Sequence, residues 1–302
     1  MCRQLKGGGM EINMEPILSV DQLTKKYKDF TLDHISFQIP RGMIVGMIGE
    51  NGAGKTTTLM SVFEMISPDS GQIRLFGKSW RENRKETLQK VGLVMDGLNQ
   101  NPRLYCKDLE NIYKRVYRNW DSLLFYQYLE RFSLPLNKKI KNFSKGMLVK
   151  LNFALALSYH PELLILDEAT SGLDPVMRDE ILELLQEFVM DEDHSVLISS
   201  HITSDLDKIA DYILFLHQGK LQFFRSMEEI ENNYGVLHCR KDFLQVLSPE
   251  DYEAYMPEDF SCKVLIRNKQ ALLSRFQDLV MERATLEDFM LFSTKWVLPC
   301  QD

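Results

Sequence analysis

A glycine-rich segment at residues 49–57 has the residue types and the spacing that can hold the phosphates of a nucleotide. It reads Gly-Glu-Asn-Gly-Ala-Gly-Lys-Thr-Thr and matches the pattern G-x-x-x-x-G-K-[ST]. Its glycines allow the backbone to wind closely around phosphate, so that the amides point inward at a helix N-terminus. Lys55 can reach the β- and γ-phosphates, and Thr56 offers a hydroxyl to Mg²⁺. The predicted phosphate site comprises Gly49, Glu50, Asn51, Gly52, Ala53, Gly54, Lys55, Thr56 and Thr57.

Two carboxylates, Asp167 and Glu168, directly follow the apolar run at residues 163–166. A buried strand can hold Asp167 beside the phosphate loop, where it supports Mg²⁺ through water. Glu168 would then face the γ-phosphate, where a carboxylate can polarise or deprotonate the attacking water. An acidic pair at a strand end is often only solvated, but the phosphate loop earlier in the chain favours the catalytic interpretation.

These features alone leave the reaction open, because kinases, GTPases and ATPases share such a loop. A GTPase would need a guanine-reading Asn-Lys-x-Asp, and the nearest match, at residues 137–140, lacks the aspartate. A further short motif, Asn142-Phe-Ser-Lys-Gly-Met147, precedes a helix with an apolar period. Taken alone, its Ser144 would be an ordinary helix N-cap.

The motifs follow segments whose patterns predict an α/β fold with a parallel central sheet. Continuous apolar runs predict strands buried on both faces at residues 43–48, 163–166 and 195–199. Residues 31–39 alternate in the manner of a half-buried strand. Helical patterns occupy residues 56–65, 110–132 and 175–190.

The chain divides into three predicted regions. Residues 1–13 are predicted to be a flexible leader, and residues 14–226 carry all of the motifs. Within that domain a helical insert is predicted at about residues 86–150. Residues 227–302 have two or three weak strands and an amphipathic stretch, which predicts a small α/β accessory domain. A unit of this size is marginally stable alone, so it is expected to pack on the larger domain or on its copy in a second subunit.

The composition of the 302 residues excludes several classes of protein. At 44% hydrophobic and 26% charged, the chain can bury a core and is not intrinsically disordered. A net charge of -7 argues against nucleic acid as the main partner. No apolar run approaches the ~18–20 residues that cross a bilayer. The five cysteines are scattered without metal-ligand or CxxC spacing, which favours reduced structural thiols in the cytosol.

Together the motifs make the chain resemble the ATP-binding subunit of ABC transporters over roughly residues 17–225. The phosphate loop, the Ser-x-Gly of the short motif, Asp167-Glu168, Ser171-Gly-Leu-Asp174 and His201 follow the order of that family. The resemblance implies a RecA-like P-loop NTPase core with an antiparallel β subdomain and an inserted helical subdomain. The small C-terminal α/β extension predicted from the residue pattern lies beyond it. It is strongest with the bacterial subgroup that pairs with separate permeases and includes exporters of antimicrobial peptides and drugs.

The resemblance also implies roles for individual residues. Tyr27 corresponds to the aromatic residue that stacks on adenine. Ser144 and Gly146 correspond to the signature residues that bind the γ-phosphate of ATP held by a partner subunit. Asp174 corresponds to the loop that crosses the dimer interface, and His201 to the histidine that contacts the γ-phosphate and positions water.

The cofactors and partners implied by the family follow from these roles. ATP and Mg²⁺ are the expected cofactors, with Thr56, Asp96 and Asp167 as the metal-binding residues. A second ATPase subunit, in a homodimer or a heterodimer, and integral-membrane permeases are the expected partners. The protein is then expected at the cytoplasmic face of the membrane, held there by its permeases, with no nucleic acid partner.

The chain departs from the family pattern in three motifs, at four positions. Lys145 and Met147 replace a glycine and the glutamine of the usual signature, and Lys145 is expected to point into solvent. Ala169 stands where a proline is usual, and Asp96 where the glutamine at the junction of core and insert is usual. An aspartate at that junction can still approach Mg²⁺ and water, but it is shorter and adds a charge.

Two alternatives remain beside a transport ATPase. Translation and repair ATPases of the family usually have two ATPase halves or long coiled coils, and this chain has neither pattern. A regulatory module that binds ATP and hydrolyses little is disfavoured by Glu168 and His201, although Asp96 and Lys145 leave it open.

Overall fold

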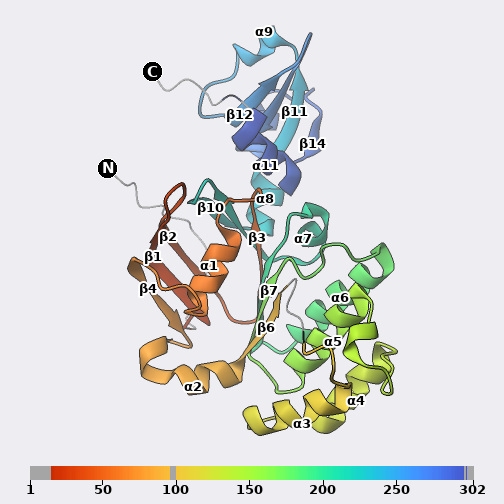
Figure 1. The fold of residues 1–302 in the computed structure, drawn as a ribbon. Coiled ribbons are helices and arrows are strands. Elements are labelled where there is room, and N and C mark those ends of the chain that lie inside the picture. The colour runs from red at the N-terminus through yellow and green to blue at the C-terminus, as the bar shows by residue number, and fades with distance from the viewer. Residues whose placement is uncertain (1–14, 96–99, 296, 298–302) are drawn as a thin grey trace.

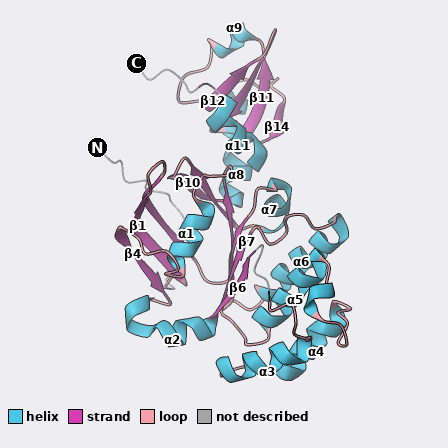
Figure 2. Ribbon diagram, in the orientation of Figure 1, coloured by secondary structure: helices cyan, strands magenta, loops and turns pink. Residues whose placement is uncertain are grey.

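The computed structural model describes residues 15–95, 100–295 and 297. The predicted leader and Asp96 lie outside the described residues. Within the described part, the strands form three sheets with helices packed around them (Figures 1 and 2). No helix in this part of the chain has the length and apolar character to cross a membrane.

The largest sheet has six strands in the order β10-β9-β3-β8-β7-β6. Its members are β3 (Ile44–Ile48), β6 (Val91–Met95), β7 (Leu163–Asp167), β8 (Ser195–Ser199), β9 (Tyr212–His217) and β10 (Lys220–Ser226). All pairings are parallel except that of β10 with β9. The predicted parallel sheet is therefore confirmed.

The central strands are buried because their side chains enter two separate cores. Along β7, Leu163 and Ile165 belong to one hydrophobic cluster, whereas Leu164 and Leu166 belong to the other. All residues of β3, β7 and β8 are buried. Since these strands are parallel and adjacent, their carboxyl ends lie at one edge of the sheet, where the predicted chemical groups follow them.

A second, antiparallel sheet has the order β2-β1-β4-β5 and lies beside the first helix (Figure 1). Its strands are β1 (Leu18–Lys26), β2 (Thr31–Ile39), β4 (Ser70–Leu75) and β5 (Lys78–Ser79). Helix α1 (Lys55–Val62) follows the phosphate loop, and α2 (Trp80–Lys90) leads into β6. This sheet is the antiparallel β subdomain expected from the family.

The helical region contains α3 (Cys106–Val116), α4 (Ser122–Arg131), the 3₁₀ turn η1 (Ile140–Asn142) and α5 (Lys145–Leu157). The helical pattern predicted at residues 110–132 is divided between α3 and α4, because α4 begins anew where Asp121 accepts a hydrogen bond from the backbone of Leu124 at 2.9 Å. The predicted insert also began too early, since β6 lies within it yet pairs with β7 in the large sheet. Helices α6 (Pro175–Phe188) and α7 (Thr203–Ile209) complete the core.

The C-terminal residues form a third sheet in the order β12-β13-β11-β14. Its elements are α8 (Met227–Asn233), β11 (Gly235–Cys239), α9 (Lys241–Leu244), β12 (Tyr252–Pro257), β13 (Cys262–Ile266), α10 (Lys269–Arg275), β14 (Met281–Arg283) and α11 (Leu286–Lys295). Figure 1 shows this blue unit at one end of the molecule, next to β10 and α7.

Helix α11 joins the C-terminal unit to the large sheet. The ring of Phe289 lies 5.3 Å from that of Phe223 on β10 and 5.1 Å from that of Tyr234. Phe292 lies 5.8 Å from Phe215 on β9. These contacts belong to the same hydrophobic cluster as one face of the large sheet. The C-terminal residues therefore share a core with the sheet that positions the phosphate loop.

Replacing Phe289 by alanine is expected to lower the free energy of unfolding of the whole chain by about 3–5 kcal/mol, because its side chain is only 1% exposed. Chemical denaturation followed by tryptophan fluorescence measures this change. Phe260→Ala is the matched control, because Phe260 is 92% exposed and its loss should cost less than about 0.5 kcal/mol. Equal effects of the two substitutions would contradict a shared core.

Candidate active site

A pocket of about 510 Å³ lies at the carboxyl edge of the large sheet. The phosphate loop runs from the end of β3 to the start of α1, the acidic pair ends β7, and His201 follows β8. The pocket thus brings together groups that are far apart in the sequence. Its walls are formed by Phe30, Glu50, Asn51, Gly52, Gly54, Lys55, Thr56, Thr57, Glu168, Ser171 and His201.

Two glycines allow the phosphate loop to take its shape. A β-carbon at Gly49 would come within 2.4 Å of the carbonyl oxygen of Leu216, so only glycine fits at this first position of the loop. Gly54 caps α1 with φ at 110°, in a region that other residues rarely adopt. The loop therefore ends directly on a helix N-terminus, which is the arrangement that binds phosphate.

The side chain of Lys55 folds back on the phosphate loop and is hydrogen-bonded to its backbone. Its Nζ donates hydrogen bonds to the carbonyl oxygens of Gly49 at 2.7 Å and Glu50 at 3.4 Å. The same nitrogen lies 3.6 Å from Oε1 of Glu168, and the side chain is only 6% exposed. A buried ammonium group that lines the pocket beside the phosphate loop can neutralise phosphate charge.

Thr56 and Asp167 bring two oxygen ligands together. The Thr56 hydroxyl donates to Oδ2 of Asp167 at 3.0 Å, and Asp167 is buried at the end of β7. Hydroxyl and carboxylate oxygens are the ligands that Mg²⁺ accepts, with the remaining positions filled by phosphate and water. These two residues therefore fit a magnesium ion bound beside the phosphate loop.

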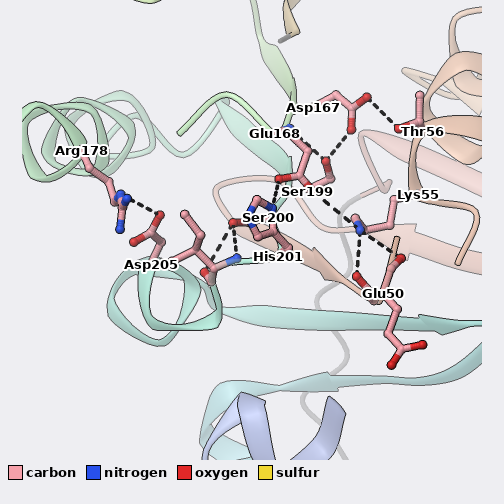
Figure 3. Close-up of polar contacts among 12 residues, drawn as sticks. Glu50, Lys55, Thr56, Asp167, Glu168, Arg178, Ser199, Ser200, His201 and Asp205 are labelled. Atoms are coloured by element: carbon pink, nitrogen blue, oxygen red, sulfur yellow. Dashed lines mark hydrogen bonds and ion pairs between the residues drawn. The ribbon is translucent and has the colours of Figure 1, made fainter. Parts of the chain in front are cut away.

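Glu168 lies between Lys55 and His201 (Figure 3). Nδ1 of His201 is 2.5 Å from Oε2 of Glu168, while Oε1 of the same carboxylate faces Lys55. The carboxylate opens into the pocket, where it can take a proton from water. His201 can orient that carboxylate and hydrogen-bond to a phosphate or to water.

Comparisons with known proteins identify the family of the chain. The family model described as ABC transporter matches residues 32–171. The bacitracin transport ATP-binding protein BcrA of Bacillus licheniformis is 35% identical over 211 residues, which span 69% of each chain. The lantibiotic transport ATP-binding protein SrtF of Streptococcus pyogenes is 33% identical over 243 residues, or 74% of this chain and all of that one. The chain belongs to the ABC transporter family. It is the ATP-binding and ATP-hydrolysing subunit.

Solved structures agree on the fold of this ABC ATPase. An ATP-binding subunit of an ABC transporter superposes with a TM-score of 0.65 at 25% identity, covering 71% of this chain and 92% of that one. An ATP-binding cassette crystallised as a dimer with ADP and Pi gives a TM-score of 0.62 at 22% identity, covering 70% and 98%. The RecA-like core with its two subdomains is thereby confirmed.

The residues expected to act on a partner's ATP do not line this ABC ATPase's own pocket. Ser144 is the exposed N-cap of α5 and accepts a hydrogen bond from the backbone of Met147 at 3.3 Å. Asp174 is the exposed N-cap of α6. Gly146 is buried against Met177, where a β-carbon would lie 2.4 Å from the methionine sulfur. Lys145 is exposed, as expected, and its ammonium group lies beside the exposed Gly172.

Two aromatic residues, Tyr27 and Phe30, lie near each other in the connection between β1 and β2. Phe30, which the sequence analysis did not single out, lines the pocket. Tyr27 does not line it, although its ring is 6.3 Å from that of Phe30 and 45% of the residue is exposed. The place of Phe30 in the short connection between β1 and β2 could have suggested it as a pocket residue, but no sequence motif includes it. Stacking of Tyr27 on adenine stays a prediction.

The sequence analysis also missed an ion pair between α6 and α7, in which Asp205 is buried and Arg178 is partly exposed. Nε of Arg178 on α6 lies 3.7 Å from Oδ2 of Asp205 on α7, and Arg178 donates to the carbonyl of Leu173 at 3.2 Å (Figure 3). Burial raises the pKa of Asp205, while the charge of Arg178 opposes that rise. This pair ties the loop before Asp174 to the helix that follows His201.

Proposed function

We propose that this ABC ATPase works as a head-to-tail dimer of two copies, which drives export through separate membrane permeases. The observation that supports the dimer is that the expected site residues lie on two separate surfaces of the chain, so that neither surface holds the complete site. Lys55, Glu168 and His201 face one pocket, whereas Ser144 and Asp174 are exposed outside it. A second copy placed head to tail would supply its Ser144 and Gly146 to this pocket and receive the same in return.

In this proposal the residues of the phosphate loop bind ATP and each group of the pocket has one task. Lys55 and the loop amides neutralise the phosphates, and Thr56 with Asp167 would hold Mg²⁺, which stabilises the charge that develops on them. Glu168 takes the proton of the attacking water, and His201 fixes the Glu168 carboxylate. ATP binding closes the dimer, and hydrolysis followed by product release reopens it.

The class of cargo is proposed from the named relatives. BcrA is a bacitracin transport protein and SrtF a lantibiotic transport protein, and both names refer to antimicrobial peptides. We assign antimicrobial peptides as the cargo class, exported by permeases that hold the ATPase at the cytoplasmic face of the membrane. The contact between Glu168 and His201 favours this active pump over a module that only binds ATP.

Resistance to peptide antibiotics tests the cargo. Sensitive cells that express this chain with its permease subunits should survive higher concentrations of bacitracin or of a lantibiotic. Cells that express the same permeases with the Glu168→Gln chain are the control and should remain sensitive. Unchanged sensitivity to both peptides, with the permeases present in the membrane and the ATPase active, would contradict export of this class of cargo.

A further inference from the structure

Ser199, the last residue of β8, contacts both members of the acidic pair from behind the pocket. Its side chain is completely buried, and it is not part of the pocket wall. The hydroxyl donates a hydrogen bond to Oδ1 of Asp167 at 2.6 Å and accepts one from the backbone N–H of Glu168 at 3.1 Å (Figure 3). One hydroxyl therefore bridges the two carboxylate residues.

The hydrogen bonds to Asp167 fix its carboxylate at both oxygens. Thr56 donates to Oδ2 at 3.0 Å, and Ser199 donates to Oδ1 at 2.6 Å. A carboxylate held at one oxygen can rotate about its last bond, whereas one held at both has its plane set. If the Thr56 hydroxyl turned to a bound Mg²⁺, the hydrogen bond from Ser199 would still hold the Asp167 carboxylate.

Glu168 needs a similar constraint because its backbone is in an unusual conformation. Its φ is 53°, in the left-handed region that non-glycine residues seldom adopt. Its N–H is shared between the carbonyl oxygen of Ser199 at 3.2 Å and the hydroxyl of the same residue at 3.1 Å. Beyond this turn the Glu168 carboxylate contacts Lys55 through one oxygen and His201 through the other.

We propose that Ser199 is a positioning residue for ATP hydrolysis, acting through Asp167 and Glu168 without touching ATP. Its hydroxyl keeps the Asp167 carboxylate oriented toward the metal and holds the backbone turn that presents Glu168 to water. The inference rests on the roles proposed above for these two carboxylates. It extends the site to a residue whose type and position carry no motif in the sequence.

Replacing Ser199 by alanine tests this role in the full chain. The kcat for ATP should fall about 10- to 100-fold, the range expected when one hydrogen bond to a charged group is lost. The KM for ATP, and ATP binding without Mg²⁺, should stay within about two-fold because the phosphate loop is intact. The Mg²⁺ concentration that gives half-maximal activity should rise several-fold, because the Asp167 carboxylate is no longer held.

Ser195→Ala is the matched control on the same strand. Ser195 is also completely buried, and its hydroxyl donates to the carbonyl of Pro40 at 3.2 Å and accepts from the backbone of Gly42 at 3.1 Å. Its loss should lower the melting temperature as much as the loss of Ser199 but leave kcat and the Mg²⁺ requirement unchanged. Equal effects of both substitutions on kcat would overturn the positioning role.

Two further variants make the outcome decisive. If Ser199→Ala does not fold, Ser199→Cys keeps a weaker donor of similar size, and its kcat should fall by less while its Mg²⁺ requirement still rises. Glu168→Gln, measured in parallel, separates the two proposals. If Glu168→Gln retains turnover, the assignment of the base is wrong. If Glu168→Gln loses turnover while Ser199→Ala retains it, only the role of Ser199 is wrong.

Discussion

Replacing Glu168 by glutamine should lower kcat for ATP hydrolysis by about 10²–10⁴-fold, while ATP affinity stays within a few fold. Glutamine preserves the size of the side chain and one oxygen, but it cannot accept the proton of the attacking water. The carboxylate is the only group of the acidic pair that lines the described pocket, and it is 2.5 Å from His201. Steady-state phosphate release and equilibrium binding of labelled ATP measure the two quantities.

The matched control for this change is Glu162→Gln. Glu162 directly precedes β7 on the same segment, but its carboxylate pairs with Lys90 at 2.6 Å and with Arg41 at 3.3 Å, outside the pocket. Its loss should leave kcat within about two-fold, since surface ion pairs of this kind contribute little. Full turnover by the Glu168→Gln protein would show that another group activates the water.

Replacing Lys55 by methionine should damage both binding and turnover. The substitution leaves an unbranched side chain one atom shorter and removes the charge that lies beside Gly49, Glu50 and Glu168. Loss of a charged hydrogen bond to phosphate should weaken ATP binding about 10- to 150-fold. Loss of the stabilisation of the developing charge should lower kcat by a further 10²–10³-fold or so.

Isothermal titration with ATP and single-turnover hydrolysis separate these two effects. Lys90→Met is the control, because Lys90 pairs with Glu162 away from the pocket and should not alter either quantity. A Lys55→Met protein that bound ATP as tightly as the unaltered chain would contradict the placement of phosphate against this loop.

The central site could be predicted because its residues follow strands whose burial is visible in the sequence. Continuous apolar runs located β3, β7 and β8, and parallel pairing places the loop, the acidic pair and His201 at one edge. The start of the helical insert was wrong because Val91–Met95 is a short apolar run. Such a run cannot be distinguished from part of a helix by its periodicity.

The remaining features depend on contacts between distant parts of the chain. Ser199 is singled out by its hydrogen bond to Asp167, and Phe30 by its place in the pocket wall. Neither could be recognised from the sequence, because a serine at a strand end and a phenylalanine in a turn are both common. The shared core of Phe289 and Phe223 likewise links segments that show separate patterns in the sequence. Tertiary packing determines these roles, and the spacing of residues along the sequence does not reveal that packing.

The molar mass of the Glu168→Gln protein in solution, with and without ATP and Mg²⁺, tests the head-to-tail dimer most directly. Size-exclusion chromatography with light scattering should give the 35.2 kDa monomer without nucleotide and about twice that mass with ATP and Mg²⁺. The dimer should revert to monomer when Ser144 is also replaced by arginine, because the partner's contact with ATP is then blocked. A protein that binds ATP and yet stays at 35.2 kDa would contradict the account.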